Sequence, residues 1–189
     1  MSPPAREVAA YVAVGSNVEP RQHIPAALDI LRRRVSISAV STVYRSQAVG
    51  PDGRPRTDHP DFLNAVFELR ADCGARELKF GILRPIEQAL GRVRTADRYA
   101  PRTIDLDVVL YGEEVIDEPL LRVPAPDLAR PFVAVPLLEL APNLVLPDTG
   151  EPLSCLGSAG APAGMTPDGP CTRALKELYE RWTPNASRS

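Results

Sequence analysis

The segment 104–110, with the sequence IDLDVVL, limits the possible folds of this chain more than any other feature. Apolar and acidic residues alternate before the run becomes wholly apolar, and β-branched side chains are frequent, so the segment predicts a β-strand. Side chains two residues apart on a strand share a face, so Asp105 and Asp107 project together. The alternate residues, which are Ile104, Leu106 and Val108, are then expected to face a hydrophobic core.

Four arginines precede this strand, in a segment with few apolar residues that contains Pro101 and predicts a loop: Arg92, Arg94, Arg98 and Arg102. Two carboxylates on one strand face lie roughly 6.5–7 Å apart. Such a pair suits Mg²⁺ when phosphate supplies the remaining oxygen ligands. Guanidinium groups match phosphate oxygens in geometry. The combination therefore favours a binding site for a triphosphate.

A simpler interpretation fits the same residues. An Asp-x-Asp pair on a strand often belongs to the solvated face of a half-covered sheet, and a run of arginines often forms a basic surface loop. The pattern at 92–107 alone leaves both interpretations open.

Composition narrows the classes of function. The 189 residues suffice for one domain with a substantial core, and the net charge of −2 argues against a general binder of nucleic acid or membrane surfaces. No apolar run reaches the length of a membrane span, and the first residues lack the apolar block of a signal peptide. The three cysteines are far apart and predict neither a disulfide framework nor a zinc site. We expect a cytoplasmic protein.

The order of the predicted elements is β-α-β-β-α-β, which is the split-βαβ arrangement of ferredoxin-like α+β domains with an antiparallel sheet. In the second helix, Pro85 is expected to kink the helix or divide it. Its apolar face is predicted to comprise Leu78, Ile82, Ile86 and Ala89. The six elements are strands at 8–14, 35–49, 62–69 and 104–110, and helices at 20–34 and 75–90.

The C-terminal part carries less information. We expect residues 1–150 to form the catalytic domain and residues 151–189 to form a proline- and glycine-rich linker with a final helix. Four residues of that helix fall on one face, and this stripe predicts docking on the core rather than a partner-binding site. They are Leu175, Leu178, Tyr179 and Trp182.

Other residues permit two interpretations each. Gly15-Ser16-Asn17 follows a strand and either offers backbone N–H groups to an anion or is an ordinary turn. Glu87 is either an exposed helix charge or an acceptor for a base or sugar. Phe62 and Asn64 share a strand face, and with Phe132 they suit a stacked and hydrogen-bonded heterocycle, although the residues alone favour a simple core for both phenylalanines.

Several segments, taken together and in order, resemble 6-hydroxymethyl-7,8-dihydropterin pyrophosphokinase, an enzyme family of the folate pathway. They are VAVGSN, VYRSQAVG, DFLNAV, IEQALGRVRTADRYAPRTIDLDVVLYG and RPFVAVPLLELAP, and the likeness runs from about residue 9 to residue 150. The resemblance implies transfer of a diphosphoryl group from ATP to the hydroxymethyl group of the pterin, with release of AMP.

The resemblance also implies roles for individual residues. Asp105 and Asp107 hold two Mg²⁺ ions, and Arg92 and Arg102 contact the triphosphate and act with them in catalysis. The remaining implied ATP contacts come from Arg94 and Arg98, on a loop that closes over the nucleotide, and from Glu87 and Arg130. The implied pterin contacts are Asn64, Phe62 and Phe132, with Ser46, Val49 and Tyr99 completing the pocket.

One departure from the family pattern concerns ATP. The chain has Val123-Pro124-Ala125-Pro126 where the family usually has VPHP, so Ala125 replaces a histidine that contacts phosphate. A catalytically weakened paralogue that binds pterin or nucleotide is therefore an alternative. A ferredoxin-like RNA-binding module is a second, but it requires exposed aromatic residues on the central strands and a basic face. We expect a monomer that acts on ATP and the pterin, with neither nucleic acid nor membrane as partner.

Overall fold

The computed structural model describes residues 7–50, 54–93, 97, 99–155 and 164–182. The strands are β1 (Val8–Ser16), β2 (Ser36–Val40), β3 (Tyr44–Ser46), β4 (Phe62–Ala71), β5 (Asp105–Tyr111), β6 (Ile116–Glu118), β7 (Leu121–Val123) and β8 (Thr166–Pro167). The helices are α1 (Pro20–Leu31), α2 (Ala75–Glu77), the π-helical segment η1 (Leu78–Leu83), α3 (Arg84–Ala89), α4 (Pro131–Leu140), the 3₁₀ turn η2 (Leu153–Cys155) and α5 (Gly169–Trp182).

The main sheet has the strand order β5-β1-β4-β3-β8, with β2 pairing the far part of β4, and every neighbouring pair is antiparallel. Strand β4 separates β1 from β2, which is the split-βαβ arrangement, so the predicted ferredoxin-like α+β class is confirmed. The short strands β6 and β7 form a separate two-stranded sheet. None of the helices within the described residues has the length and apolarity that crossing a membrane requires.

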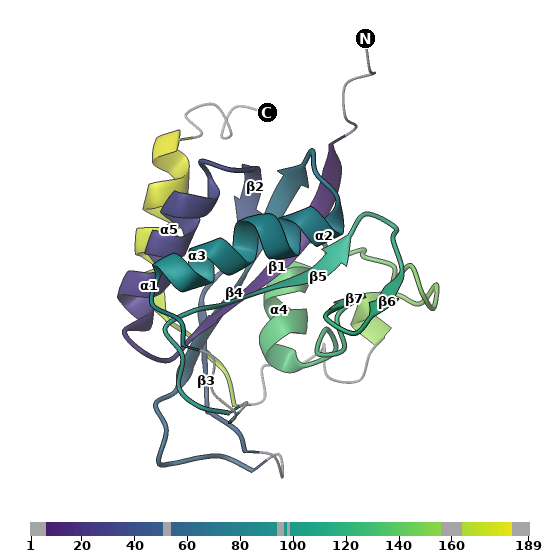
Figure 1. Cartoon of the computed structure of the whole chain (residues 1–189). Coiled ribbons are helices and arrows are strands. Elements are labelled where there is room, and N and C mark those ends of the chain that lie inside the picture. Colours follow the sequence, from purple (N-terminus) through teal and green to yellow (C-terminus); the bar gives the residue numbers. More distant parts are fainter. Residues whose placement is uncertain (1–6, 51–53, 94–96, 98, 156–163, 183–189) are drawn as a thin grey trace.

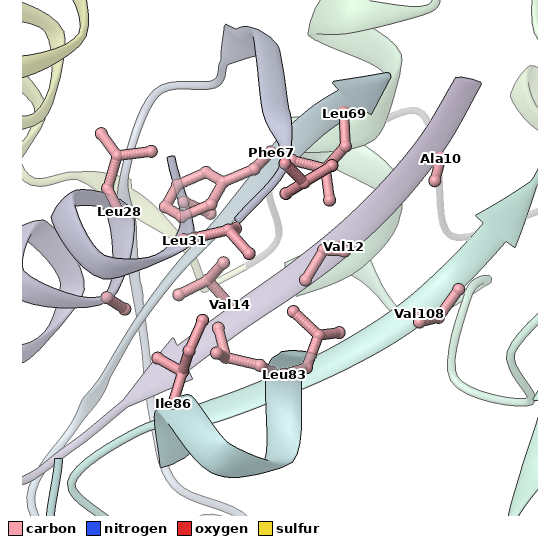
Figure 2. Close-up of a cluster of buried hydrophobic side chains, with 14 of the residues drawn as sticks. Ala10, Val12, Val14, Leu28, Leu31, Phe67, Leu69, Leu83, Ile86 and Val108 are labelled. Carbon is pink, nitrogen blue, oxygen red and sulfur yellow. The ribbon is translucent and has the colours of Figure 1, made fainter. Parts of the chain in front are cut away.

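The two faces of the sheet are covered differently. Helices α1 and α5 lie side by side, and the α2–η1–α3 helix crosses the same face, while α4 packs on the other (Figure 1). Figure 2 shows Leu28 and Leu31 of α1 and Leu83 of η1 directed toward the β1 side chains Val12 and Val14. This first face is apolar along β1 from Val8 to Val14, and polar groups of the site lie on the α4 face, at one end of β5, β1 and β4.

The strand expected at 35–49 is instead two strands, and Ser41 lies at the break. Its backbone N–H donates to the Val66 carbonyl oxygen (3.0 Å), and its Oγ accepts from the Val66 N–H (2.9 Å). The serine hydroxyl thus replaces a backbone acceptor in the ladder, so the chain remains on β4 while it bends between β2 and β3.

The helix expected at 75–90 is continuous but widens before Pro85. The N–H of Arg84 donates to the carbonyl oxygen of Lys79, five residues back, because the segment is π-helical. This wider turn accommodates Pro85, which has no N–H and whose ring clashes with an α-helical carbonyl four residues back. The extra residue shifts the buried face. Leu83 is therefore buried and Ala89 exposed, which corrects the face predicted from an α-helical period.

The C-terminal helix docks as the stripe predicted. Cys171 and Leu175 of α5 are buried, and Leu178, Tyr179 and Trp182 pack against the main core. The segment before it also contributes, because β8 pairs with β3 and Met165 is buried. Residues 164–182 are thus part of the same core as the strands that precede them.

Candidate functional site

The acidic and amide residues predicted for the site lie in one row across the sheet. Gly15 of β1 pairs with Asp105 of β5 on one side and with Asn64 of β4 on the other. Paired residues point to the same face, and two strand spacings separate Asp105 from Asn64 by about 9–10 Å between Cα atoms. Asp107 projects from the same face, two residues further along β5. Ile104, Leu106 and Val108 are buried on the opposite face, as predicted.

Gly15 keeps the centre of this row open. A Cβ atom added at this position would lie 3.3 Å from Oδ1 of Asn64 and 3.9 Å from the Phe62 ring. Any side chain in place of the glycine would therefore fill the space between the amide and the carboxylates. The site requires a residue without a side chain here, for reasons of space rather than of backbone conformation.

Asp105 is the centre of a charged cluster. Its Oδ1 accepts a hydrogen bond from Arg92, and its Oδ2 accepts one from Nη1 of Arg102 at 2.6 Å. The Arg102 guanidinium also lies 5.7 Å from the centroid of the Phe62 ring. The structure thus brings together Arg92, Arg102 and Asp105, three of the four residues predicted for catalysis.

The Glu87 carboxylate orients Arg92 through a direct contact. Its side chain is buried, and Oε1 accepts from Arg92 and from the backbone N–H of Leu106 at 2.9 Å. The interpretation of Glu87 as an exposed helix charge is therefore wrong. The π-helical segment aligns α3 so that this carboxylate reaches the backbone of β5.

Asp107 has a partner that the sequence did not reveal. Nζ of Lys79 lies 2.6 Å from Oδ1 of Asp107, and about half of the Asp107 side chain remains exposed (52%). Lys79 belongs to the π-helical segment, 28 residues before Asp107, so only the folded chain shows this pair. The three basic and three acidic side chains of this cluster balance in charge: Lys79, Arg92 and Arg102 against Glu87, Asp105 and Asp107.

The cluster shifts proton affinities in two directions. Burial disfavours the charged form of Asp105, but Arg92 and Arg102 outweigh it and hold the pKa of Asp105 below its usual value. Burial likewise opposes the charge on Arg92, but Asp105 and Glu87 raise the Arg92 pKa. Partial desolvation raises the pKa of Asp107, against the opposing Lys79 ammonium group. Asp105 is therefore held ionised by its own protein partners.

The predicted pterin residues gather on β3 and β4. Nδ2 of Asn64 donates to Oγ of Ser46 at 2.9 Å, and the buried Asn64 lies on the same face as the half-buried Phe62. Val49 forms an isolated bridge with Pro55 beyond the end of β3. A hydrogen-bonded amide beside an aromatic ring and the Arg102 guanidinium is suited to a flat polar heterocycle.

Asn17 connects the segment that precedes β4 to the arginine loop that precedes β5. Its Nδ2 donates to the Pro60 carbonyl oxygen (3.2 Å), and its Oδ1 accepts from the Arg102 N–H (2.7 Å). The N–H groups of Asn17 and Val18 both donate to the Arg102 carbonyl oxygen. The Asn17 N–H, one of those considered for an anion, therefore holds the arginine loop instead. A small amide residue after a strand was the only sequence signal.

The remaining predicted residues have more varied surroundings. Phe132, at the start of α4, packs near Ala13, the residue paired with Asp107.

Arg130 is exposed, and its Nε donates to Asp127 (3.0 Å). The half-buried Tyr99 has its backbone N–H on Asp97 (2.8 Å), a contact that leaves its predicted pterin role untested. Arg94 and Arg98 lie outside the described residues.

Ala125 replaces the expected histidine at a closed position. Its methyl group is buried with Val109 and Val133, and its N–H donates to the Val109 carbonyl oxygen at 2.9 Å. A cavity of about 320 Å³ opens instead beside α3, lined by Arg84, Glu87, Gln88 and Arg92. The charged cluster therefore has an adjoining hollow with a basic rim.

Known proteins share both the sequence and the fold. The model of the family described as 7,8-dihydro-6-hydroxymethylpterin-pyrophosphokinase matches residues 11–142. The 2-amino-4-hydroxy-6-hydroxymethyldihydropteridine pyrophosphokinase of Pseudomonas aeruginosa is 45% identical over 142 residues, which cover 73% of this chain and 83% of that protein. The enzyme of the same name from Haemophilus influenzae is 38% identical, over 75% and 87% of the two chains.

A solved structure supports the fold alone. A crystal structure of Plasmodium falciparum HPPK-DHPS with pteroate aligns with a TM-score of 0.64 at 10% identity, over 88% of this chain and 47% of that one. This chain thus spans about half the length of that protein. The match to the family model and the identity with the bacterial enzymes carry more information. The chain therefore belongs to the 7,8-dihydro-6-hydroxymethylpterin-pyrophosphokinase family.

Proposed function

We propose that the site row from Asp105 to Asn64 carries out the pyrophosphokinase reaction of this family. The enzyme is an ATP-dependent diphosphotransferase of folate biosynthesis. The hydroxymethyl oxygen of 6-hydroxymethyl-7,8-dihydropterin forms a bond to the β-phosphorus of ATP, the bond from that phosphorus to the AMP oxygen breaks, and the hydroxyl proton is released. The observation that carries the proposal is the open row, with carboxylates and arginines at one end and an amide and an aromatic ring at the other.

The arginines bind and orient the triphosphate. Arg92 and Arg102 are paired with Asp105, and a phosphate group, like a carboxylate, offers two anionic oxygens to a guanidinium group. On nucleotide binding, each guanidinium exchanges part of its contact with Asp105 for a phosphate oxygen. Both then stabilise the charge that develops as AMP departs, and Glu87 keeps Arg92 in place during the exchange. Arg94, Arg98 and Arg130 are proposed to add contacts around the nucleotide.

The carboxylate pair fits two Mg²⁺ ions. Asp105 and Asp107 offer hard oxygen donors on one face, and within the described residues no third acidic, histidine or cysteine side chain completes a protein-only site. Phosphate oxygens must supply the rest. The six cluster charges already cancel, so ATP with about four negative charges is balanced by two divalent cations. When bound, Mg²⁺ withdraws charge from the phosphate oxygens and fixes their geometry.

The pterin occupies the other end of the row. Asn64 presents its amide to the heterocycle, with Ser46 fixing the amide orientation through the 2.9 Å hydrogen bond. Phe62 and Phe132 flank the ring, and Val49 and Tyr99 close the pocket. This arrangement brings the hydroxymethyl group toward the open centre at Gly15, and proximity of the two substrates supplies much of the rate enhancement.

The remaining proposals concern the whole protein. Residues 1–150 form the catalytic domain, and the enzyme acts in the cytoplasm as a monomer on two small-molecule substrates. The near-neutral net charge of −2 supports the absence of nucleic acid as a partner. A monomer is expected to elute at the volume of a 20.5 kDa protein in size-exclusion chromatography with light scattering.

A coupled assay of AMP release tests the reaction. We expect AMP only when ATP, Mg²⁺ and 6-hydroxymethyl-7,8-dihydropterin are all present, and mass spectrometry of the product should show the pterin diphosphate. The Asp107→Ala variant should lower turnover on the order of 10³-fold with little change in thermal stability. ADP or phosphate release without pterin contradicts the proposal, as does binding of both substrates without AMP.

A further inference from the structure

The C-terminal segment adds a strand beside the proposed pterin pocket. It lies beyond residue 142, where the family match ends. Within it, Thr166 of β8 pairs with Arg45, and Pro167 pairs with Tyr44. Strand β3 pairs on its other edge with Phe62–Asn64 of β4. The strand that carries Ser46 is thus held between the pocket and the C-terminal segment.

Asp168 is the main contact between the C-terminal segment and strand β3. Its side chain is almost fully buried, at 3% exposure. One carboxylate oxygen, Oδ1, accepts from the Cys171 N–H (3.0 Å) and from Nε of Arg21 (3.2 Å). The other, Oδ2, accepts from Nη2 of Arg21 (2.8 Å) and Nη2 of Arg45 (2.9 Å). One carboxylate therefore joins the start of α5, the first turn of α1 and strand β3.

The backbone is fixed at the same place. The N–H of Asp168 donates to the Val43 carbonyl oxygen (2.7 Å), and Oγ1 of Thr172 accepts from the Val43 N–H (3.0 Å). The same Oγ1 donates to the Asp168 carbonyl oxygen (2.8 Å). Both backbone groups of Val43, the residue just before β3, are satisfied by the C-terminal segment. This leaves β3 little freedom to shift along β4.

The contacts continue from Asp168 into the pocket. Nη1 of Arg45 lies 3.8 Å from Oδ2 of Asp61, the residue that precedes Phe62. The next residue after Arg45 is Ser46, whose Oγ accepts from Asn64. A single arginine thus links the buried carboxylate of the C-terminal segment to the start of β4, and in the chain it directly precedes the serine that orients the amide.

We propose that Asp168 is a positioning residue for the pterin half of the site, acting through Arg45 and strand β3. This inference rests on the proposed function. Without the carboxylate, Arg45 loses its buried partner and β3 keeps only its backbone contacts to the C-terminal segment, so the Ser46–Asn64 pair is less well ordered before the pterin binds. The nucleotide half lies on β5 and α3, on the far side of β1, and is expected to keep its geometry.

Steady-state kinetics with both substrates tests the assignment. Asp168→Asn keeps the shape and an acceptor for Cys171 but removes the charge, and Arg45→Met removes the link to β3. Both should raise the KM for hydroxymethyldihydropterin by about 5–20-fold, with the KM for ATP and kcat within about twofold of wild type. Arg21→Met is the matched control, because it removes an arginine from the same carboxylate but joins α1 rather than β3. It should lower the melting temperature and leave the pterin KM unchanged.

The outcomes separate the two proposals. Pterin-dependent AMP release by wild type, with an unchanged pterin KM in both Asp168→Asn and Arg45→Met, overturns the positioning role but not the function. An equal rise in both KM values in all three variants also overturns it, because it indicates general loosening. Absence of AMP from the wild-type enzyme instead refutes the proposed function. If Asp168→Asn does not fold, Arg45→Met decides, since its side chain is 42% exposed and its removal leaves no cavity.

Discussion

Two aspartates in this molecule each bind two arginines, but their surroundings differ. Asp105 binds Arg92 and Arg102, and Asp168 binds Arg21 and Arg45. The Asp105 side chain is 35% exposed, whereas that of Asp168 is 3% exposed. Asp168 also accepts a backbone N–H at the start of α5, which no ligand can displace without unwinding the helix.

The difference shows how one set of charges can serve either binding or structure. The arginines of Asp105 can exchange a carboxylate for a phosphate oxygen because the cluster is open on one side. The carboxylate of Asp168 is enclosed by its partners and by α5, so it holds elements together. The proposed function of Asp105 thus requires exchangeable partners, and the stabilising role of Asp168 requires fixed ones.

The largest effect is expected for Asp105→Asn. The amide keeps the size of the side chain but loses the charge that holds both arginines and that we propose binds cations, so turnover should fall on the order of 10³-fold. The cluster is partly exposed, and the free energy of unfolding should change by less than about 1 kcal/mol. AMP-release kinetics and urea unfolding measure the two quantities. A loss of stability equal to that of Asp168→Ala would remove the contrast between the clusters.

The converse is expected for Asp168→Ala. This change removes the helix cap and the shared partner of two arginines, and the free energy of unfolding should fall by about 2–4 kcal/mol. Both arginines are partly exposed and can turn to solvent, which keeps the loss below that of a fully buried pair. Urea unfolding measures the loss. Asp29→Ala, on an exposed helix pair, is the control and should cost less than about 1 kcal/mol.

Sequence reasoning succeeded where a short period decides the structure. The alternation at 104–108 placed both aspartates on one face, and the order of the elements predicted the ferredoxin-like sheet. Sequence reasoning failed where the partner or the burial of a side chain depends on the packing of a helix against a strand. The π-helical segment before Pro85 changed the buried face of its helix, and the pairs Lys79–Asp107 and Glu87–Arg92 are visible only in the folded chain.

The segment before α5 held a signal that composition concealed. Composition predicts a proline- and glycine-rich linker at the start of residues 151–189, yet Asp168 precedes a glycine, a proline and an amphipathic stripe. That order is typical of a helix N-terminus with an acidic cap. The partners Arg21 and Arg45 lie more than 120 residues away, so only the folded chain reveals the ion pairs.

The pH dependence of stability sharpens the comparison. The hydrogen bonds from Arg21, and more weakly those from Cys171 and Arg45, hold the pKa of Asp168 below its ordinary value, although burial opposes them. A lowered folded pKa contributes stability that is present above the unfolded pKa of about 3.9 and is lost as the pH falls through the folded value. The difference in unfolding free energy between wild type and Asp168→Asn should therefore be constant from pH 7 to pH 5 and shrink below about pH 4. A difference that grows in acid would contradict the assigned charge state.

The smallest effect is expected for Lys79→Met, which tests whether the partners of the open cluster are exchangeable. Nζ of Lys79 lies 2.6 Å from Oδ1 of Asp107, where we propose that a cation binds, so the ammonium group is expected to compete with a divalent cation. Removing the charge while keeping the apolar stem should tighten Mn²⁺ binding about two- to fivefold in titrations without nucleotide, and the gain should diminish at high salt. Lys176→Met, on the exposed surface of α5, is the control and should leave Mn²⁺ affinity unchanged. Weaker Mn²⁺ binding in Lys79→Met would mean that Lys79 orders Asp107 for the cation instead of competing with it.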